Sequence, residues 1–431
     1  MLKLYITPLD QEVTVHGWDY HDPSVPEGSP TWQYTSVKQD YNFDPTIKYE
    51  ILSELYLPET DPEISQQISG MRVAGKSFID ALVDEAMILT KNYSDTLKAN
   101  LASGRTNWDP QGTVQVWDTR LNRYIPLFGV TMRARRWFDI REGYTNSAGY
   151  YQLPGFKREA NYALFYESGN CDVRTGTFGQ AWIDGPKQSD PWNVNLLDGV
   201  QRFYAHVFRG AHRYHHEYIG GLSRPYFPAR IKYAAHDKSG SAQGVNLGNW
   251  TAFGINPNIL IYRYSSSSRE YASDEIFSTT CHETCHSTHV PVMNAVYIQY
   301  SQVTTFIAES WPVAVEWFLT QMEYRERGIA NYGTESYRIT ASFPLDGGYQ
   351  FWDRGISTNY TPIFIDLVDN FNQSSLNSTL PNDNVSGYTL ANIESTFLKN
   401  VYGLSSLRTA LKNNKPAGVT DAQIDLLLSS Y

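Results

Sequence analysis

Two histidines four residues apart, within a stretch that has a helical pattern, constrain the fold of this chain more than any other feature. They are His282 and His286, and Glu283 follows the first of them in the sequence H-E-T-C-H. Residues four apart lie on one face of a helix, so both imidazoles can reach the same ion. Glu283 can sit beside a metal-bound water without binding the ion itself. The three residues therefore offer two zinc ligands and a general base for metal-assisted hydrolysis.

The segments before this motif predict how the fold holds it. The apolar run 259–262 predicts a buried strand, and the polar run 265–268 predicts a loop. Ser273 is suited to cap a helix whose first turn carries acidic residues. We expect that helix to span 274–289 and to stop near Pro291, because proline ends helices. The predicted order is strand, loop, and then the helix that carries both histidines.

A glutamate on the next helix is the candidate third ligand. A catalytic zinc site needs three protein ligands and an open position for water. The sequence predicts a second helix over 305–327, and Glu309 lies near its beginning. If the second helix returns antiparallel to the first, the Glu309 carboxylate can face the two histidines.

This pattern resembles the gluzincin metallopeptidases, the thermolysin-like clan, in which H-E-x-x-H is followed by a glutamate on a later helix. The resemblance covers residues 195–330 and implies zinc held by His282, His286 and Glu309, with Glu283 as general base. Four residues after the ligand glutamate, thermolysin has an acidic residue that bonds a ligand histidine, whereas this chain has a valine. A glutamate on the same helix face, Glu316, is a candidate for that contact. The choice between Glu309 and Glu316 as third ligand therefore stays open.

Other histidines and the cysteines near the motif have alternative interpretations. His289 lies too far along the helix to share one ion with both motif histidines, so we expect it to support a ligand or the helix end. Three histidines on an earlier predicted helix could form a second metal site or simply favour the helix C-terminus. We expect the cysteines to be small buried side chains and not disulfide partners. The residues concerned are His212, His215 and His216, and Cys171, Cys281 and Cys285.

A chain of 431 residues suggests two to four domains, and the patterns predict an α+β protein. We expect an N-terminal accessory region over 1–108 and a small β-sandwich over 109–170. A zincin-type catalytic subdomain over 190–330 and a mainly helical C-terminal subdomain over 331–431 follow. The stretches P-L-F-G-V-T-M-R-A and T-N-S-A-G-Y-Y resemble carboxypeptidase-regulatory-like β-sandwich modules, which are common in secreted proteins.

Periodicity and turn residues place further elements along the chain. Predicted helices cover 76–92, 196–218, 362–368, 393–402 and 422–431, and predicted strands cover 113–118, 162–166, 230–236 and 249–253. The runs 126–135 and 145–151 each predict a turn that leads into a strand. The run 187–191 is a predicted linker. Of these strands, 249–253 is the candidate sheet edge along which an extended peptide could bind. Tyr360, in the C-terminal subdomain, is the candidate donor that stabilises an oxyanion.

These observations favour a zinc metallopeptidase that acts on peptide, protein or glycoprotein substrates. A non-catalytic, zinc-stabilised surface protein that binds glycan or protein is the alternative, and an enhancin-like peptidase for glycoproteins is a narrower variant. The net charge of −10 and the absence of a basic run argue against nucleic acid as a partner. No run is long and apolar enough to cross a membrane. If a leader has been removed, we expect a secreted, periplasmic or cell-surface protein.

Overall fold

The computed structural model describes residues 23–26, 31, 35, 42–50, 72–73, 76–77, 108–136, 139–156, 159–176, 179–225, 230–247, 258–293, 302–332, 352 and 357–431. The chain forms two compact units. The smaller one comprises residues 1–3, 35–108 and 155–158, and the larger one comprises 4–34, 109–154 and 159–431.

In the smaller unit, strands β1 (Arg72–Val73) and β2 (Lys76–Ser77) pair in antiparallel fashion. The helix that we predicted over 76–92 is therefore wrong at its first two residues. Its remaining residues lie outside the part of the chain that the structure describes.

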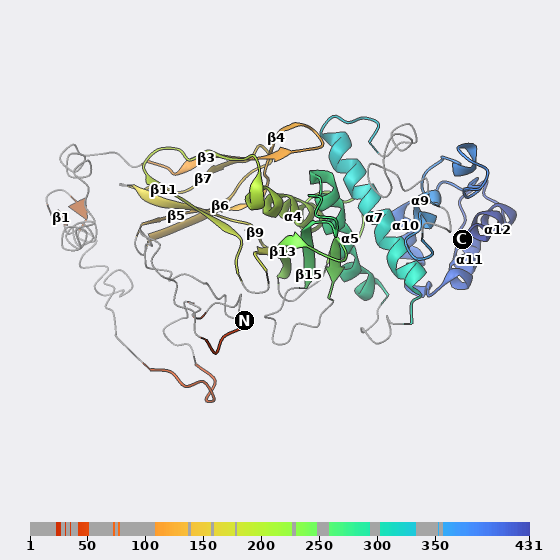
Figure 1. Cartoon of the computed structure of the whole chain (residues 1–431), viewed down its shortest axis with the longest axis horizontal. Helices are drawn as coiled ribbons and strands as arrows, with labels where there is room; N and C mark the ends of the chain where they lie inside the picture. Colours follow the sequence, from red (N-terminus) through yellow and green to blue (C-terminus); the bar gives the residue numbers. More distant parts are fainter. Residues whose placement is uncertain are drawn as a thin grey trace. The chain divides into compact units, whose positions relative to one another are not determined.

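Two sheets make up the β-rich part of the larger unit (Figure 1). One has the strand order β11-β8-β5-β6, and the other has the order β12-β3-β4 with β7 also paired to β3. Strand β3 alternates between half-buried and fully buried residues, as its sequence predicted. The strands are β3 (Gln111–Asp118), β4 (Arg123–Pro126), β5 (Thr131–Arg136), β6 (Asp139–Tyr144), β7 (Tyr150–Gln152), β8 (Ala160–Phe165), β11 (Trp182–Gln188) and β12 (Val194–Leu196).

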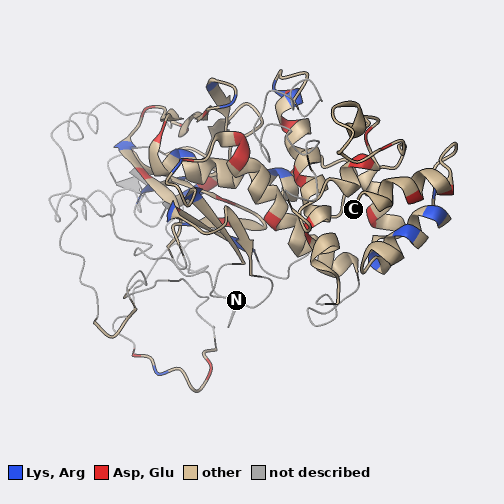
Figure 2. Cartoon of the chain, turned by 45° about the vertical axis from the view of Figure 1, so that its right-hand side comes forward, with Lys and Arg blue, Asp and Glu red and all other residues tan. Residues whose placement is uncertain are grey.

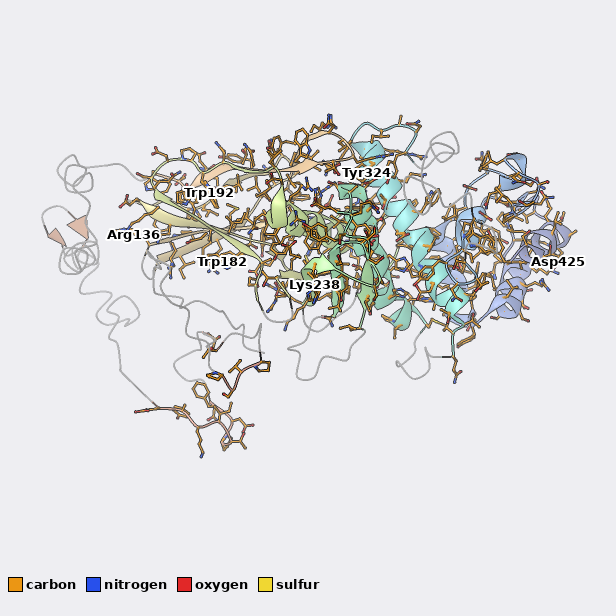
Figure 3. The ribbon with its side chains drawn as sticks, viewed as in Figure 1. Arg136, Trp182, Trp192, Lys238, Tyr324 and Asp425 are labelled. Atoms are coloured by element: carbon orange, nitrogen blue, oxygen red, sulfur yellow. The ribbon has the colours of Figure 1, made fainter. Side chains whose placement is uncertain are left out.

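Aromatic side chains join these two sheets. The Tyr151 ring on β7 lies 6.3 Å from the Tyr162 ring on β8. The ring of Trp192, which is labelled in Figure 3, lies 5.5 Å from Tyr162. Such edge-on and tilted contacts bury large apolar areas between layers. Lys187 and Gln188 belong to β11, so the linker predicted over 187–191 is wrong at these two residues.

A third sheet of the larger unit has five strands in the order β14-β15-β13-β10-β9. Its central strands β10, β13 and β15 are parallel, whereas β14 and β9 run antiparallel to their neighbours. The strands predicted over 230–236 and 259–262 are confirmed, and the one predicted over 249–253 lies outside the described residues. Within those residues, β14 is the edge beside β15. The strands are β9 (Glu167–Ser168), β10 (Cys171–Arg174), β13 (Ile231–Ser239), β14 (Gly244–Asn246) and β15 (Ile259–Tyr264).

Two long helices, α4 (Gly199–His216) and α5 (Ser273–Val292), pack beside this sheet, and a third, α7 (Thr305–Glu326), packs against α5. Helix α5 lies between α4 and α7 (Figure 1). All three were predicted, but two details of α5 were wrong. Ala272 is the N-cap and Ser273 the first helical residue, because the Ser273 hydroxyl bonds His206 and Thr119 instead. The helix also continues through Pro291, since a proline removes only one backbone hydrogen bond in a final turn.

After residue 357, the described chain consists of short helices joined by turns. They are α9 (Ile363–Asp366), η4 (Gln373–Ser375), α10 (Leu390–Thr396), η5 (Leu398–Asn400), α11 (Leu404–Asn413) and α12 (Asp421–Ser429). Thr420 caps α12 by accepting a hydrogen bond from the Gln423 backbone, as its sequence suggested. Their apolar faces share one core with α5 and α7. The predicted α+β class is therefore confirmed.

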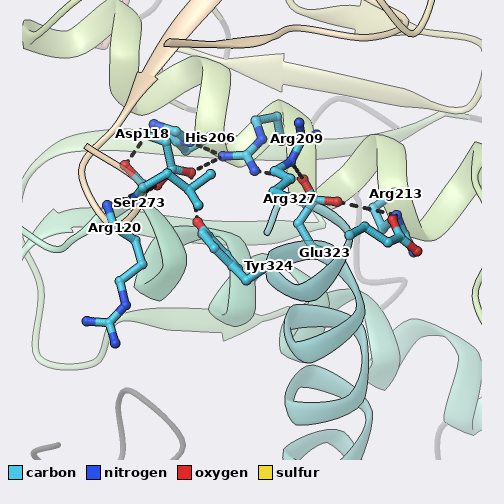
Figure 4. A network of polar contacts seen from close by, with 12 residues as sticks. Asp118, Arg120, His206, Arg209, Arg213, Ser273, Glu323, Tyr324 and Arg327 are labelled. Atoms are coloured by element: carbon cyan, nitrogen blue, oxygen red, sulfur yellow. Dashed lines mark hydrogen bonds and ion pairs between the residues drawn. The ribbon is translucent and has the colours of Figure 1, made fainter. Parts of the chain in front are cut away.

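A buried polar network ties the β-rich part to the helices (Figure 4). Asp118, at the end of β3, accepts hydrogen bonds from Arg209 on α4 and Tyr324 on α7, both at 2.9 Å. Arg209 also donates to Glu323 on α7 at 2.8 Å. Elsewhere, acidic and basic side chains are interspersed along the described chain (Figure 2). Within the described residues, no helix combines the length and apolar character that crossing a membrane requires.

Candidate metal centre

Three ligand atoms from two helices converge at one point. The Glu309 Oε2 atom lies 3.3 Å from His282 Nε2 and 3.4 Å from His286 Nε2. Among the described residues, these three form the group whose ligand atoms lie close enough together to hold a metal ion. Helix α5 supplies both histidines from one face, and α7 supplies the glutamate as it packs along α5.

The spacing of the three atoms suits a tetrahedral ion. Zinc binds histidine nitrogen and carboxylate oxygen at ~2.0–2.2 Å, so two ligands of a tetrahedral site lie about 3.3–3.6 Å apart. The two distances to Glu309 lie in this range. The donor set of two imidazoles and one carboxylate is also one that catalytic zinc sites use. The residues therefore fit a zinc ion without rearrangement of the two helices.

Glu316 contacts the other ring nitrogen of His282. Its Oε2 atom lies 3.1 Å from His282 Nδ1, so the Nδ1–H can donate to Glu316 and leave the Nε2 lone pair for a metal. Burial would lower the pKa of His282, but the Glu316 and Glu309 carboxylates outweigh burial and raise it well above its ordinary value. The two carboxylates thus favour positive charge at this point, which a bound cation would provide.

Glu283 lies against the edge strand of the sheet. A Cβ atom on Gly244 of β14 would lie 2.6 Å from Glu283 Oε1, so only glycine leaves room for this carboxylate. Burial raises the pKa of Glu283, with the nearby histidines acting in the opposite direction. Asn246 of β14 donates to the Glu283 carbonyl and, at 2.9 Å, to the Ser287 hydroxyl. The sequence analysis missed Gly244 and Asn246, because a three-residue strand carries no periodicity.

Tyr360 lies beside the centre, on the segment that precedes α9. Its ring stacks 6.1 Å from the His282 ring and remains 48% exposed. Ser310, the neighbour of Glu309, donates to the Asn359 carbonyl at 2.9 Å and so holds this segment on α7. Burial and the Glu309 carboxylate raise the pKa of Tyr360, so its hydroxyl stays protonated and can donate a hydrogen bond.

The other candidates lie away from the ligand atoms. His289 is fully buried, its ring 6.5 Å from that of Trp311, and burial lowers its pKa to about 3. His212 contacts Glu217 at 3.0 Å and His215 contacts the Tyr233 hydroxyl at 3.0 Å. Neither these histidines nor His216 belongs to a metal-holding group among the described residues. The three cysteines are free and buried, as predicted.

No protein-family model, curated protein or solved structure matches this chain.

Proposed function

We propose that this protein is a zinc-dependent peptidase with its active site at His282, His286 and Glu309. The observation that carries the proposal is the convergence of two Nε2 atoms and one carboxylate oxygen at 3.3 and 3.4 Å. A gluzincin-like relationship is part of the proposal. The order of a parallel strand, the H-E-x-x-H helix and a helix bearing the glutamate supports it.

The residues of the chain divide the work of hydrolysis between them. When bound, zinc supplies Lewis-acid polarisation of a carbonyl oxygen and lowers the pKa of water. Glu283 takes the proton of the attacking water and passes it to the leaving amine. Burial raises the pKa of Glu283. A carboxylate with a raised pKa is a stronger base near neutral pH, which suits the residue that carries the proton in both steps. Tyr360 donates a hydrogen bond to the oxygen on which negative charge develops.

Strand β14 supports a peptide as the substrate. It forms the edge of the sheet within the described residues and runs antiparallel to β15. An extended peptide can bind such an edge through backbone hydrogen bonds. Gly244 on β14 lies next to the Glu283 carboxylate, so a peptide bound there would pass beside the proposed base.

The substitution Glu283→Gln tests this proposal. The variant keeps both histidines and Glu309, so we expect it to bind one zinc ion per chain, as the unchanged protein does. Loss of the base should lower kcat/KM by roughly 10²–10⁴-fold. Zinc content is measured by elemental analysis, and activity on a mixture of internally quenched peptides. Glu142→Gln, on the exposed side of β6, serves as the control and should leave both values unchanged.

Two outcomes would contradict the proposal. Full activity in Glu283→Gln would remove Glu283 from the mechanism. A zinc-loaded protein that cleaves neither peptides nor glycopeptides would favour a non-catalytic binding protein.

A further inference from the structure

Two buried aspartates meet in the C-terminal region, far along the chain from the zinc centre. Asp366 ends α9 and is fully buried, and Asp383 lies in the loop before α10 with 3% exposure. Buried carboxylates are rare unless a cation, an arginine or a set of donors accompanies them. Asp383 Oδ1 accepts a hydrogen bond from the Val385 backbone, whereas its Oδ2 has no hydrogen-bond partner among the described residues.

A glutamine lies beside Asp366. Gln373 is fully buried, and its Nε2 donates to Asp366 Oδ1 at 2.7 Å. The preceding residue, Asn372, accepts a hydrogen bond from the Asp383 backbone at 3.0 Å. Gln373 therefore contacts Asp366 directly, and the Asp383 backbone is tied to the residue that precedes Gln373. Tyr431 also donates its hydroxyl to Asp366.

Two oxygen atoms of this cluster accept no hydrogen bond. They are Asp383 Oδ2 and Gln373 Oε1, both buried in residues that are at least nine-tenths inaccessible. A buried acceptor without a donor destabilises the folded protein, and more so if it is charged. Since both atoms are acceptors, neither can satisfy the other. A single cation could interact with both oxygen atoms.

We propose that Asp366, Gln373 and Asp383 bind a calcium ion, with Asp383 Oδ2 and Gln373 Oε1 among its ligands. Calcium takes six to eight oxygen ligands from carboxylates, side-chain amides, backbone carbonyls and water. The cluster offers the first two of these. The absence of histidine and cysteine from the cluster disfavours zinc. The site is independent of the proposed peptidase centre.

A proton is the rival occupant. Burial and the neighbouring Asp366 raise the pKa of Asp383 to about 9. A protonated Asp383 could donate to Gln373 Oε1 and satisfy both atoms. An experiment can distinguish the two occupants, because only the binding of a calcium ion depends on added CaCl₂.

Thermal unfolding of the zinc-loaded full chain, with and without CaCl₂, separates them. We expect saturating CaCl₂ to raise the unfolding temperature by about 5 °C. In Asp383→Asn, Asn can still accept from the Val385 backbone and can donate to Gln373, so the variant should fold and lose the shift. Asp425→Asn, on the exposed α12 (Figure 3), should keep it. Glu309→Gln should also keep it, because the zinc centre takes no part.

Terbium provides a direct readout of the same site. TbCl₃ takes calcium positions and emits when an aromatic side chain nearby is excited. Tyr431 bonds Asp366, and Trp352 stacks on Tyr431 at 4.7 Å, so the site has such side chains. We expect emission from the unchanged protein that CaCl₂ quenches and that Asp383→Asn lacks. A protein that shows no calcium shift and no terbium emission would overturn the proposal in favour of the shared proton, as would an equal shift in Asp383→Asn.

Discussion

His282 uses its two ring nitrogens for two different carboxylates. Its Nε2 faces Glu309 at 3.3 Å, and its Nδ1 faces Glu316 at 3.1 Å. Only Glu309 also reaches His286. At the level of the sequence, both glutamates lie on one face of the same helix, so spacing alone could not separate a ligand from its supporting partner. The distances do so, and they place Glu316 where it orients His282.

Replacing Glu316 should weaken zinc binding without removing a ligand. We expect Glu316→Ala to reduce zinc affinity by about 10–100-fold, because the His282 ring loses the acceptor that holds its orientation and tautomer. Glu316→Gln keeps an acceptor for Nδ1–H and should lose less. Competition with a coloured zinc chelator measures both values. Glu309→Gln, which alters a ligand, should lose more than either, and the reverse order would exchange the two roles.

At the scale of elements, the sequence predicted the parts of the site that carry long periodic patterns. The strand β15 and the helices α5 and α7 follow from apolar runs and from helical spacing, with errors of one to a few residues at their ends. The strand β14 could not be found in this way. It holds its place through pairing with β15, and such pairing between distant segments leaves no local signal.

The close approach of α4 and α5 is another feature that spacing does not reveal. A Cβ atom on Gly210 of α4 would lie 2.7 Å from Thr280 Cβ and 2.9 Å from the Phe277 carbonyl, both on α5. Two helices therefore touch at their backbones, two residues before the first motif histidine. Glycine is ordinarily a poor helix former, so Gly210 weakens the sequence-based prediction of this helix. In the structure, the same glycine allows α4 to pack closely against α5.

Gly210→Val should push α5 away from α4. Overpacking of this kind costs about 1–3 kcal/mol of the free energy of unfolding, and the displaced α5 should also bind zinc less tightly. Urea unfolding and zinc titration measure the two effects. Arg408→Val places the same side chain on the exposed face of α11, where we expect a cost below about 1 kcal/mol and no change in zinc affinity. Equal effects of the two substitutions would mean that the close contact between α4 and α5 at Gly210 does not limit the size of the side chain there.

At the scale of the whole larger unit, one buried network connects the β-rich part to the helices of the zinc centre. Asp118 comes from β3, Arg209 from α4 and Glu323 from α7. These residues are far apart in the sequence, and each one alone resembles an ordinary surface charge. No pattern in the chain pairs them, so the way in which the sheets are attached to the helices could not be predicted. Breaking such a buried charge pair typically costs 3–5 kcal/mol.

His206 makes this network sensitive to acid. Its Nδ1 atom lies 2.8 Å from Arg209 Nη1 and therefore accepts a hydrogen bond, while its Nε2 faces the Trp117 carbonyl at 3.1 Å. A proton on Nδ1 would remove this acceptor and place a second positive charge against Arg209. Burial first, and then Arg209, accordingly lower the pKa of His206 to about 3. The imidazole is neutral in the folded protein and becomes charged when the chain unfolds below about pH 6.5.

Comparing the pH dependence of stability in the unchanged protein and in a His206 variant should reveal the protonation state of His206 in the folded protein. Between about pH 6 and pH 4 the unfolded chain binds a proton at His206 that the folded chain does not, so stability is present above pH 6.5 and falls as the pH decreases. His206→Gln can still accept from Arg209 but cannot titrate. Urea unfolding at several pH values gives the slope of the free energy of unfolding against pH. We expect this slope to be smaller in the variant than in the unchanged protein by about 1.4 kcal/mol per pH unit. Zinc release and the titration of other buried histidines affect both proteins alike, so they cancel in the difference. Parallel curves over this range would mean that His206 is already protonated in the folded protein, and the Arg209 contact could not then be as the structure has it.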